Sequence, residues 1–130
     1  MQTKSGSAGD AKLSDLANKR ILLVEDEVII AMMLEDMITE LGGIVVGPAA
    51  TLESGLAFAR NEELDGAILD VNLGEGNSSA IADVLAARSI PFVMATGYGH
   101  ATDNLHSAPL LQKPYLMNDL QRALRSILGV

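Results

Sequence analysis

Short apolar runs alternate with segments of helical periodicity along most of the chain. Continuous apolar runs of this length are typical of strands buried on both faces of a sheet. They predict strands at residues 21–24, 44–46, 67–69, 91–95 and 110–112. Between them, apolar residues spaced three and four apart favour helices. The helices are predicted at residues 28–41, 51–60, 78–88 and 116–128.

Several local features refine these elements. Gly42-Gly43 is expected to end the first helix and Gly47-Pro48 to close the second strand, while Thr51 can cap the helix that follows. In the first helix, the spacing puts Ile30, Leu34, Met37 and Leu41 on one buried face. The methionines, Met32 and Met33 among them, are interpreted as core filling.

Strands that alternate with helices predict an α/β fold with a parallel sheet and right-handed crossovers. Five such units in 130 residues indicate a flavodoxin-like, doubly wound, five-stranded parallel sheet of order 2-1-3-4-5. The fourth helix should lie between Gly97 and Ala108. This segment contains two glycines and one large aliphatic residue, Leu105, so a short, frayed or absent helix is expected.

The first 18 residues are rich in Ser, Gly, Ala and Lys and contain few large apolar side chains. A segment of this composition cannot bury enough apolar surface to offset the entropy lost on ordering. The domain organisation predicted is therefore a flexible tail at residues 1–18, followed by one domain at residues 19–130.

Composition excludes several classes of function. The chain has no cysteine, which rules out disulfides and thiolate metal sites. Its formal net charge of −8 disfavours nucleic-acid binding. No apolar run approaches the roughly 18 residues that span a bilayer, and no secretory signal is visible. A soluble, cytoplasmic protein without nucleic-acid or membrane partners is expected, and a monomer is favoured.

Polar side chains follow four of the predicted strands at the point where each strand ends. Glu25 and Asp26 follow the first strand, Asp70 the third, Thr96 the fourth and Lys113 the fifth. In an open parallel sheet, the carboxyl ends of the strands meet at one rim, where ligands bind. The sequence therefore predicts that these scattered side chains converge.

Three carboxylates, a hydroxyl and an ammonium at one rim suit phosphoryl chemistry. Clustered carboxylates repel one another, and a hard cation such as Mg²⁺ relieves that repulsion through oxygen ligands. An aspartate can attack phosphorus as a nucleophile. A cation on each side and a hydrogen-bond donor would then stabilise charge on the phosphoryl oxygens, roles that fit Mg²⁺, Lys113 and Thr96.

Four motifs in order resemble the receiver domain of two-component response regulators, of the CheY-like superfamily. They are residues 21–27 (ILLVEDE), 67–73 (AILDVNL), 95–97 (ATG) and 112–114 (QKP). The resemblance covers residues 19 to 130. It implies that Asp70 is the phosphoacceptor, assisted by a switch hydroxyl on Thr96 and by Lys113.

The same resemblance implies a Mg²⁺ site. Asp26 would be a direct ligand and Glu25 would act through water, while Asp70 and the backbone carbonyl of Asn72 would complete the protein ligands. A narrower resemblance links residues 91–98 (PFVMATGY) to the FATGUY subclass of alphaproteobacterial receivers, although Met94 stands where that signature has Phe.

Receivers usually carry an aromatic switch residue three positions before the lysine. Here that position is Leu110, and Tyr98 is the nearby aromatic that could replace it. A switching role for Tyr98 and simple packing over the site are both open.

The function implied is that of a stand-alone response regulator. It would accept a phosphoryl group from a sensor histidine kinase, of the HWE or HisKA2 type by subclass, and would signal by protein contact or act as a phosphate sink. It would assist its own phosphorylation and dephosphorylation and would not be an enzyme with a separate substrate. The alternatives are an aspartate-nucleophile phosphatase, a flavin or nucleotide binder, and a pseudo-receiver used only for interaction. The acidic first turn after a strand, which lacks a glycine-rich cradle, argues against the nucleotide binder.

Overall fold

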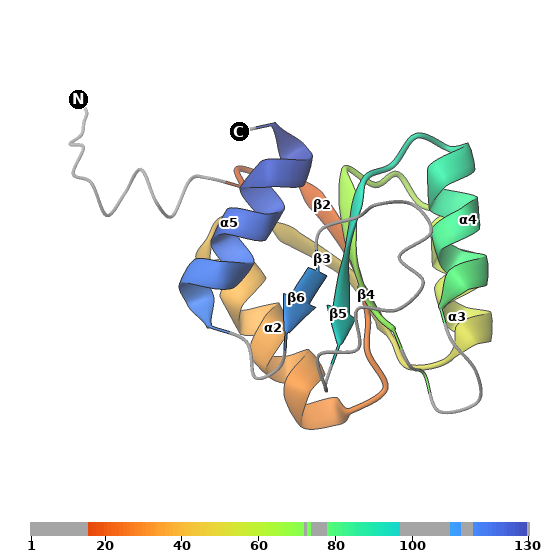
Figure 1. Ribbon diagram of the computed structural model, residues 1–130, viewed down its shortest axis with the longest axis horizontal. Coiled ribbons are helices and arrows are strands. Elements are labelled where there is room, and N and C mark those ends of the chain that lie inside the picture. The colour runs from red at the N-terminus through yellow and green to blue at the C-terminus, as the bar shows by residue number, and fades with distance from the viewer. Residues whose placement is uncertain (1–15, 72, 74–77, 97–109, 113–115, 130) are drawn as a thin grey trace.

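The computed structural model describes residues 16–71, 73, 78–96, 110–112 and 116–129 (Figure 1). Strands and helices alternate through this part of the chain. In chain order they are β2 (Arg20–Val24), α2 (Val28–Glu40), β3 (Ile44–Ala49), α3 (Leu52–Asn61), β4 (Gly66–Asp70), α4 (Ser79–Ala87), β5 (Phe92–Thr96), β6 (Leu110–Gln112) and α5 (Met117–Leu128).

The strands form one parallel sheet, five-stranded, in the order β3-β2-β4-β5-β6. Counted along the chain, this is the order 2-1-3-4-5. Helices α2 and α5 cover one face, and α3 and α4 cover the other (Figure 1). The predicted doubly wound α/β fold with a parallel sheet is confirmed, whereas the expected fourth helix, at residues 97–108, lies outside the described residues.

Each central strand sends alternate side chains into two separate cores. In β2, Ile21 and Leu23 pack toward α2 and α5, while Leu22 and Val24 pack toward α3 and α4. All four side chains are fully buried. This burial on both faces is why the strand is a continuous apolar run and not an alternating one.

Strand β3 is longer than predicted. Gly47 adopts a φ of 103°, and the pairing with β2 shifts register between Leu22 and Val24, so that Ala49 still pairs with Val24. A positive φ is accessible to glycine without steric cost, which lets the chain pass this irregularity and rejoin the sheet. Gly47-Pro48 therefore interrupts the pattern without ending the strand.

Helix α3 begins as the sequence predicts. The Thr51 hydroxyl accepts the backbone N–H of Ser54 at 3.1 Å, and the Ser54 hydroxyl accepts the backbone N–H of Thr51 at 3.3 Å. This reciprocal capping box satisfies two donors that the first helical turn leaves without intrahelical partners. The capping role predicted for Thr51 is confirmed.

The buried face of α2 is centred differently from the prediction. Ala31, Leu34 and Ile38 are its buried residues, and Ile30 and Met37 lie at the edge of the core. Met32 is 58% exposed, so its assignment to the core is wrong. The helix is apolar on more than one face, and periodicity alone does not decide which apolar stripe packs inward.

Residues 16–18 belong to the folded domain, although the sequence placed them in the tail. Leu16 is fully buried in the core formed with α2 and α5. Its backbone N–H donates to the carbonyl of Leu41 at 3.0 Å, and that of Asn18 donates to Gly42 at 2.9 Å. One anchoring leucine in a polar context gives no periodic signal, so the predicted domain boundary lies too late.

Substitution of Leu16 tests this boundary. Leu16→Ala should lower the free energy of unfolding by about 2–5 kcal/mol, the usual cost of truncating a buried leucine. Urea denaturation measures the loss, and Leu116→Ala, at a side chain that is 63% exposed, is the matched control. If the two variants are equally stable, Leu16 does not stabilise the fold, and residues 16–18 should be assigned to the tail.

Candidate functional site

Asp70 is the last residue of the central strand β4. Its Cα pairs in register with that of Ala95 in β5, and the backbone N–H of Val71 donates to the carbonyl of Ala95 at 2.8 Å. Pairing with β5 therefore fixes the backbone of Asp70, and the residue is only 4% exposed.

Glu25 and Asp26 follow β2, the neighbour of β4 in the sheet, where Val24 pairs with Leu69. Glu25 is 2% exposed and its backbone N–H donates to the carbonyl of Ala49 at 2.9 Å. Its Oε2 accepts the backbone N–H of Glu27 at 3.1 Å. Glu27 is the N-cap of α2, so the turn that starts the helix also orients the Glu25 carboxylate.

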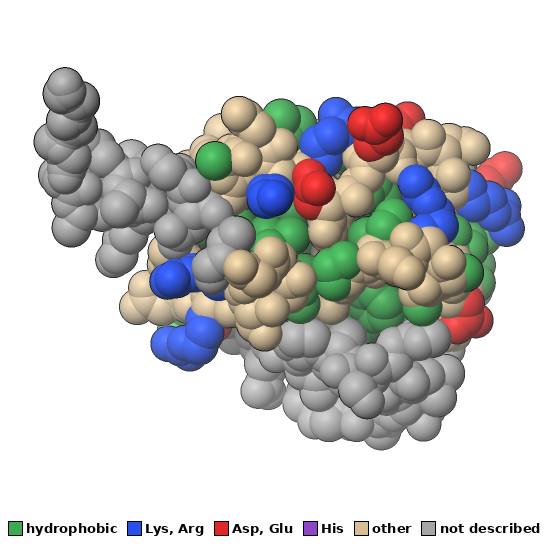
Figure 2. Space-filling model, turned by 90° about the horizontal axis from the view of Figure 1, so that it is seen from above, with side chains coloured by type: hydrophobic (Ala, Val, Ile, Leu, Met, Phe, Trp, Pro, Cys, Tyr) green, Lys and Arg blue, Asp and Glu red, His purple; other side chains and the backbone are tan. Residues whose placement is uncertain are grey.

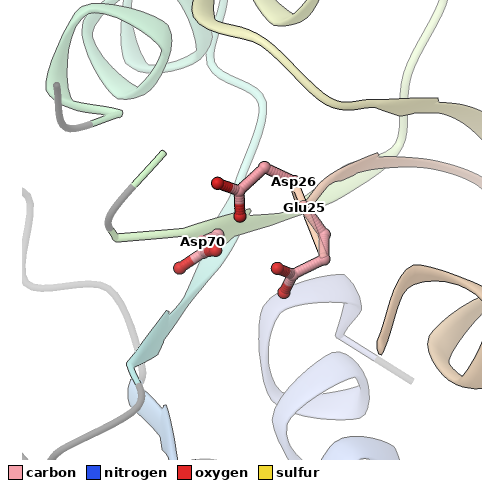
Figure 3. Close-up of side chains that lie close together, drawn as sticks. All are labelled: Glu25, Asp26 and Asp70. Carbon is pink, nitrogen blue, oxygen red and sulfur yellow. The ribbon is translucent and has the colours of Figure 1, made fainter. Parts of the chain in front are cut away.

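The side chains of Glu25, Asp26 and Asp70 converge at the rim formed by these strand ends (Figure 3). One carboxylate oxygen from each lies within 4.8 Å of the other two. Glu25 and Asp70 are buried and Asp26 is partly exposed, which leaves the cluster open to solvent on one side. The predicted convergence of these three residues is found.

Carboxylates at this spacing repel one another, by about 1 kcal/mol per pair in the dielectric of water and by more in a partly buried setting. Nearly full burial of two of them removes the solvent that would screen the charge. Hard divalent cations take oxygen ligands in this geometry and cancel the repulsion. The three carboxylates therefore fit a small divalent cation, and Mg²⁺ is the cation that uses few protein ligands and shares the rest with water or phosphate.

The other predicted site residues are described only in part. Thr96 ends β5, one residue beyond the partner of Asp70, and pairs in register with Gln112 of β6. The backbone thus brings Thr96 to the same rim. Asn72, Tyr98 and Lys113 lie outside the described residues.

Sequence reasoning missed one feature beside this cluster. Val28, Ile29 and Met32, on the first turns of α2, are 70%, 81% and 58% exposed. The signal that could have found them is the helical wheel of α2, in which these three residues share a stripe with Asp36 and Glu40.

The face of the molecule seen from above carries charges of both signs, with Lys and Arg side chains beside Asp and Glu side chains (Figure 2). Among the described residues, Arg20 of β2 pairs with Glu62 at 3.1 Å. A second pair, Arg122 with Asp119 at 3.5 Å, lies in the first turns of α5. In the residues that the structure describes, no helix is both long and apolar enough to cross a bilayer.

No family model matches the chain. Among curated proteins, it is 36% identical over 94 residues to the phyllosphere-induced regulator PhyR of Methylorubrum extorquens, an alignment that covers 70% of this chain and 35% of PhyR. The chain spans between 35% and 53% of the length of the curated relatives that it matches.

Solved structures cover more of it. The chain is similar to SdrG of Sphingomonas melonis Fr1, with 45% identity, a TM-score of 0.76, and coverage of 90% of this chain and 99% of SdrG. A BeF3-activated conformation of SdrG is also known, and matches with 44% identity and a TM-score of 0.73 over 86% of this chain and 98% of that one.

The chain is also similar to the receiver domain of the sensor histidine kinase PA1611 from Pseudomonas aeruginosa PAO1, with 25% identity, a TM-score of 0.76, and coverage of 88% of this chain and 100% of that one. That domain has a magnesium ion coordinated in its active site cleft. The fold, the acidic cluster beside Asp70 and the similarity to these proteins all indicate the same family. The chain belongs to the family of response regulator receiver domains.

Proposed function

We propose that the chain accepts a phosphoryl group on Asp70 in a two-component phosphorelay. The observation that carries this proposal is the cluster of Glu25, Asp26 and Asp70, in which one carboxylate oxygen from each residue lies within 4.8 Å of the other two at the rim of the sheet. The phosphoryl group would be loaded onto the chain itself, with no separate substrate turned over.

In the proposed transfer, a carboxylate oxygen of Asp70 attacks phosphorus and the bond from phosphorus to the donor imidazole nitrogen breaks. The products are an acyl phosphate on Asp70 and a histidine on the donor, which leaves as neutral imidazole because its other ring nitrogen carries a proton. The pairing of Asp70 with Ala95 of β5 and the hydrogen bond from Val71 to Ala95 hold the nucleophile in place, so that little ordering is required when the donor arrives.

The residues proposed to hold Mg²⁺ are Asp26 and Asp70 directly, Glu25 through water, and the backbone carbonyl of Asn72. Bound there, Mg²⁺ would neutralise charge on the phosphoryl oxygens. The magnesium ion in the PA1611 receiver domain supports this assignment. Thr96 is proposed to donate a hydrogen bond to the phosphoryl group and Lys113 to supply the second positive charge.

The proposed phosphodonor is a sensor histidine kinase of the HWE or HisKA2 type, and the similarity to SdrG and PhyR supports a role in regulation. Three finer points stay predictions. They are membership of the FATGUY subclass, a switching role for Tyr98, and a stand-alone output by protein contact or as a phosphate sink. Asp70 ends β4, the third strand along the chain. This position weighs against an aspartate-nucleophile phosphatase, because those enzymes usually place the nucleophile after the first strand.

Asp70→Asn tests the phosphoacceptor. The amide lacks the anionic oxygen that attacks phosphorus, so labelling by acetyl phosphate in the presence of Mg²⁺ should be abolished while the fold is kept. Mass spectrometry measures the added phosphoryl group. Asp83→Asn, at an exposed acid of α4, should label like the unmodified chain. Label that persists in Asp70→Asn would assign the acceptor to another residue.

Thermal unfolding tests the metal site. Mg²⁺ at about ten times its Kd should raise the free energy of unfolding by about 1.4 kcal/mol. Asp26→Asn should unfold at a higher temperature than the unmodified chain without Mg²⁺, because it removes one charge from a repulsive cluster, and should lose most of the Mg²⁺-induced shift.

The matched control for this experiment is Glu27→Gln, which removes an exposed acid next to the cluster. It should keep the Mg²⁺-induced shift. A shift of equal size in the Asp26→Asn variant would place the cation elsewhere.

A further inference from the structure

The edge strand β3 carries one residue more than β2 over the same stretch of the sheet. Where the register shifts, two residues of β3, Gly47 and Pro48, lie opposite a single residue of β2, Leu23. An extra residue of this kind is a β-bulge, and bulges are common next to active sites, where they change the direction of the chain. This bulge lies close to the rim of the sheet at which the acidic cluster forms.

The bulge decides which residue of β3 continues the ladder. Pro48 has no backbone N–H and cannot donate to a neighbouring strand. In a regular strand Pro48 would pair with Val24, whereas after the bulge Ala49 takes that place. Gly47 and Pro48 are exposed and Ala49 is buried, so the two extra positions face solvent and the strand then returns to the core. The last residue of β3 before the rim is therefore Ala49.

Gly47 gives the bulge its conformation. Its φ of 103° lies in a region that L side chains rarely adopt. A Cβ atom at this position would lie 2.8 Å from the backbone nitrogen of Ala49 and 3.1 Å from the carbonyl oxygen of Leu23. Both neighbours are backbone atoms, so they cannot move away as a flexible side chain could. A side chain at position 47 would therefore shift Ala49 relative to β2.

Ala49 in turn holds the first residue of the acidic cluster. The backbone N–H of Glu25 donates to the carbonyl of Ala49 at 2.9 Å. The pairing of β2 with β4 ends one residue earlier, at Val24 and Leu69. The Glu25 carboxylate then accepts the backbone N–H of Glu27 at 3.1 Å. The place of Glu25 at the rim thus depends on where the bulge puts the Ala49 carbonyl.

We propose that Gly47 is a positioning residue for the Mg²⁺ site, an inference that rests on the proposed function. It acts through the Ala49 carbonyl on the backbone of Glu25, and so on the distance between the carboxylates of Glu25 and Asp70. Mg²⁺ demands near-ideal octahedral geometry, so a small displacement of one acid weakens its binding. Asp70 is held separately, by its pairing with Ala95 of β5. The bulge should therefore affect metal binding and leave the nucleophile in place.

Gly47→Ala tests this role. The Kd for Mg²⁺, measured by titration calorimetry at a temperature at which the variant is folded, should rise by about tenfold, as is usual when a residue that orients metal ligands is changed. Labelling by acetyl phosphate should be slow at low Mg²⁺ and should recover at saturating Mg²⁺, because Asp70 keeps its position. The amide proton of Glu25 should exchange with solvent faster, since its acceptor has moved.

The matched control is Gly43→Ala, just before the start of the same strand. A Cβ atom there would lie 2.8 Å from Cγ2 of Ile38, so this variant is also destabilised by a steric contact, but at the other end of β3 from the acidic cluster. Circular dichroism should show a lower melting temperature for both variants. Gly43→Ala should keep the Kd for Mg²⁺ within about twofold of the unmodified chain, because distant sites act independently.

A second measurement needs no substitution. Coupling between two sites is reciprocal, so if the hydrogen bond from Glu25 to Ala49 favours Mg²⁺ binding, Mg²⁺ favours that bond by the same factor. Saturating Mg²⁺ should slow exchange of the Glu25 amide, followed by NMR, about tenfold more than exchange of the Ile44 amide. The Ile44 amide donates to the carbonyl of Lys19 at 2.8 Å and joins β3 to the start of β2. Equal slowing of the two amides would contradict the proposal, even if Gly47→Ala does not fold.

Two results with the variants would overturn the inference. The first is a Kd for Mg²⁺ in Gly47→Ala within about twofold of that of the unmodified chain. The second is an equal rise in Kd in Gly43→Ala, which would assign the effect to a general loss of stability. If the unmodified chain neither binds Mg²⁺ nor is labelled by acetyl phosphate, the proposed function fails instead.

Discussion

Repulsion among the carboxylates of Glu25, Asp26 and Asp70 is the constraint around which this domain is organised. Nothing in the three side chains themselves favours their approach. They are held together because β2 and β4 are paired in register and both strands end at the rim. Complete burial of a large aliphatic side chain stabilises a fold by about 1.5–3 kcal/mol, so a few residues of the sheet offset this repulsion. Hydrophobic packing elsewhere in the domain thus maintains the repulsion that a bound cation would relieve.

The two cores make this arrangement rigid. Because alternate residues of β2, β4 and β5 enter opposite cores, a shift of one strand by one residue would exchange every contact on both faces. Such a shift would also displace Asp70 relative to Glu25. Correct packing and correct spacing of the acids are therefore selected together, which explains why the functional residues can lie so far apart in the sequence.

The sequence predicts most of the sheet and the convergence of the acids, for a simple reason. Buried parallel strands produce continuous apolar runs, and the first polar residue after each run marks its carboxyl end. The extension of β3 beyond Gly47 could not be predicted this way, because it depends on a positive φ that lets an interrupted pattern rejoin the sheet.

The errors at Met32 and Leu16 arise from tertiary contacts and not from the local backbone conformation. Helix α2 is apolar on two sides, and only the positions of β2 and α5 decide that Ala31, Leu34 and Ile38 face inward. Leu16 is a single residue without local pattern, and the cavity that it fills is formed by residues distant in sequence. Tertiary contacts determine both outcomes, and single-sequence patterns do not contain them.

The burial of Leu16 sets how this domain can be shortened or fused. A chain cut just before β2 would lose the side chain that packs beneath the end of α2, together with two backbone hydrogen bonds to Leu41 and Gly42. A fusion joined upstream of Leu16 keeps them. Its attachment point lies at the end of α2 farthest from the acidic cluster, so a tag or a second module placed there leaves access to Asp70 unobstructed.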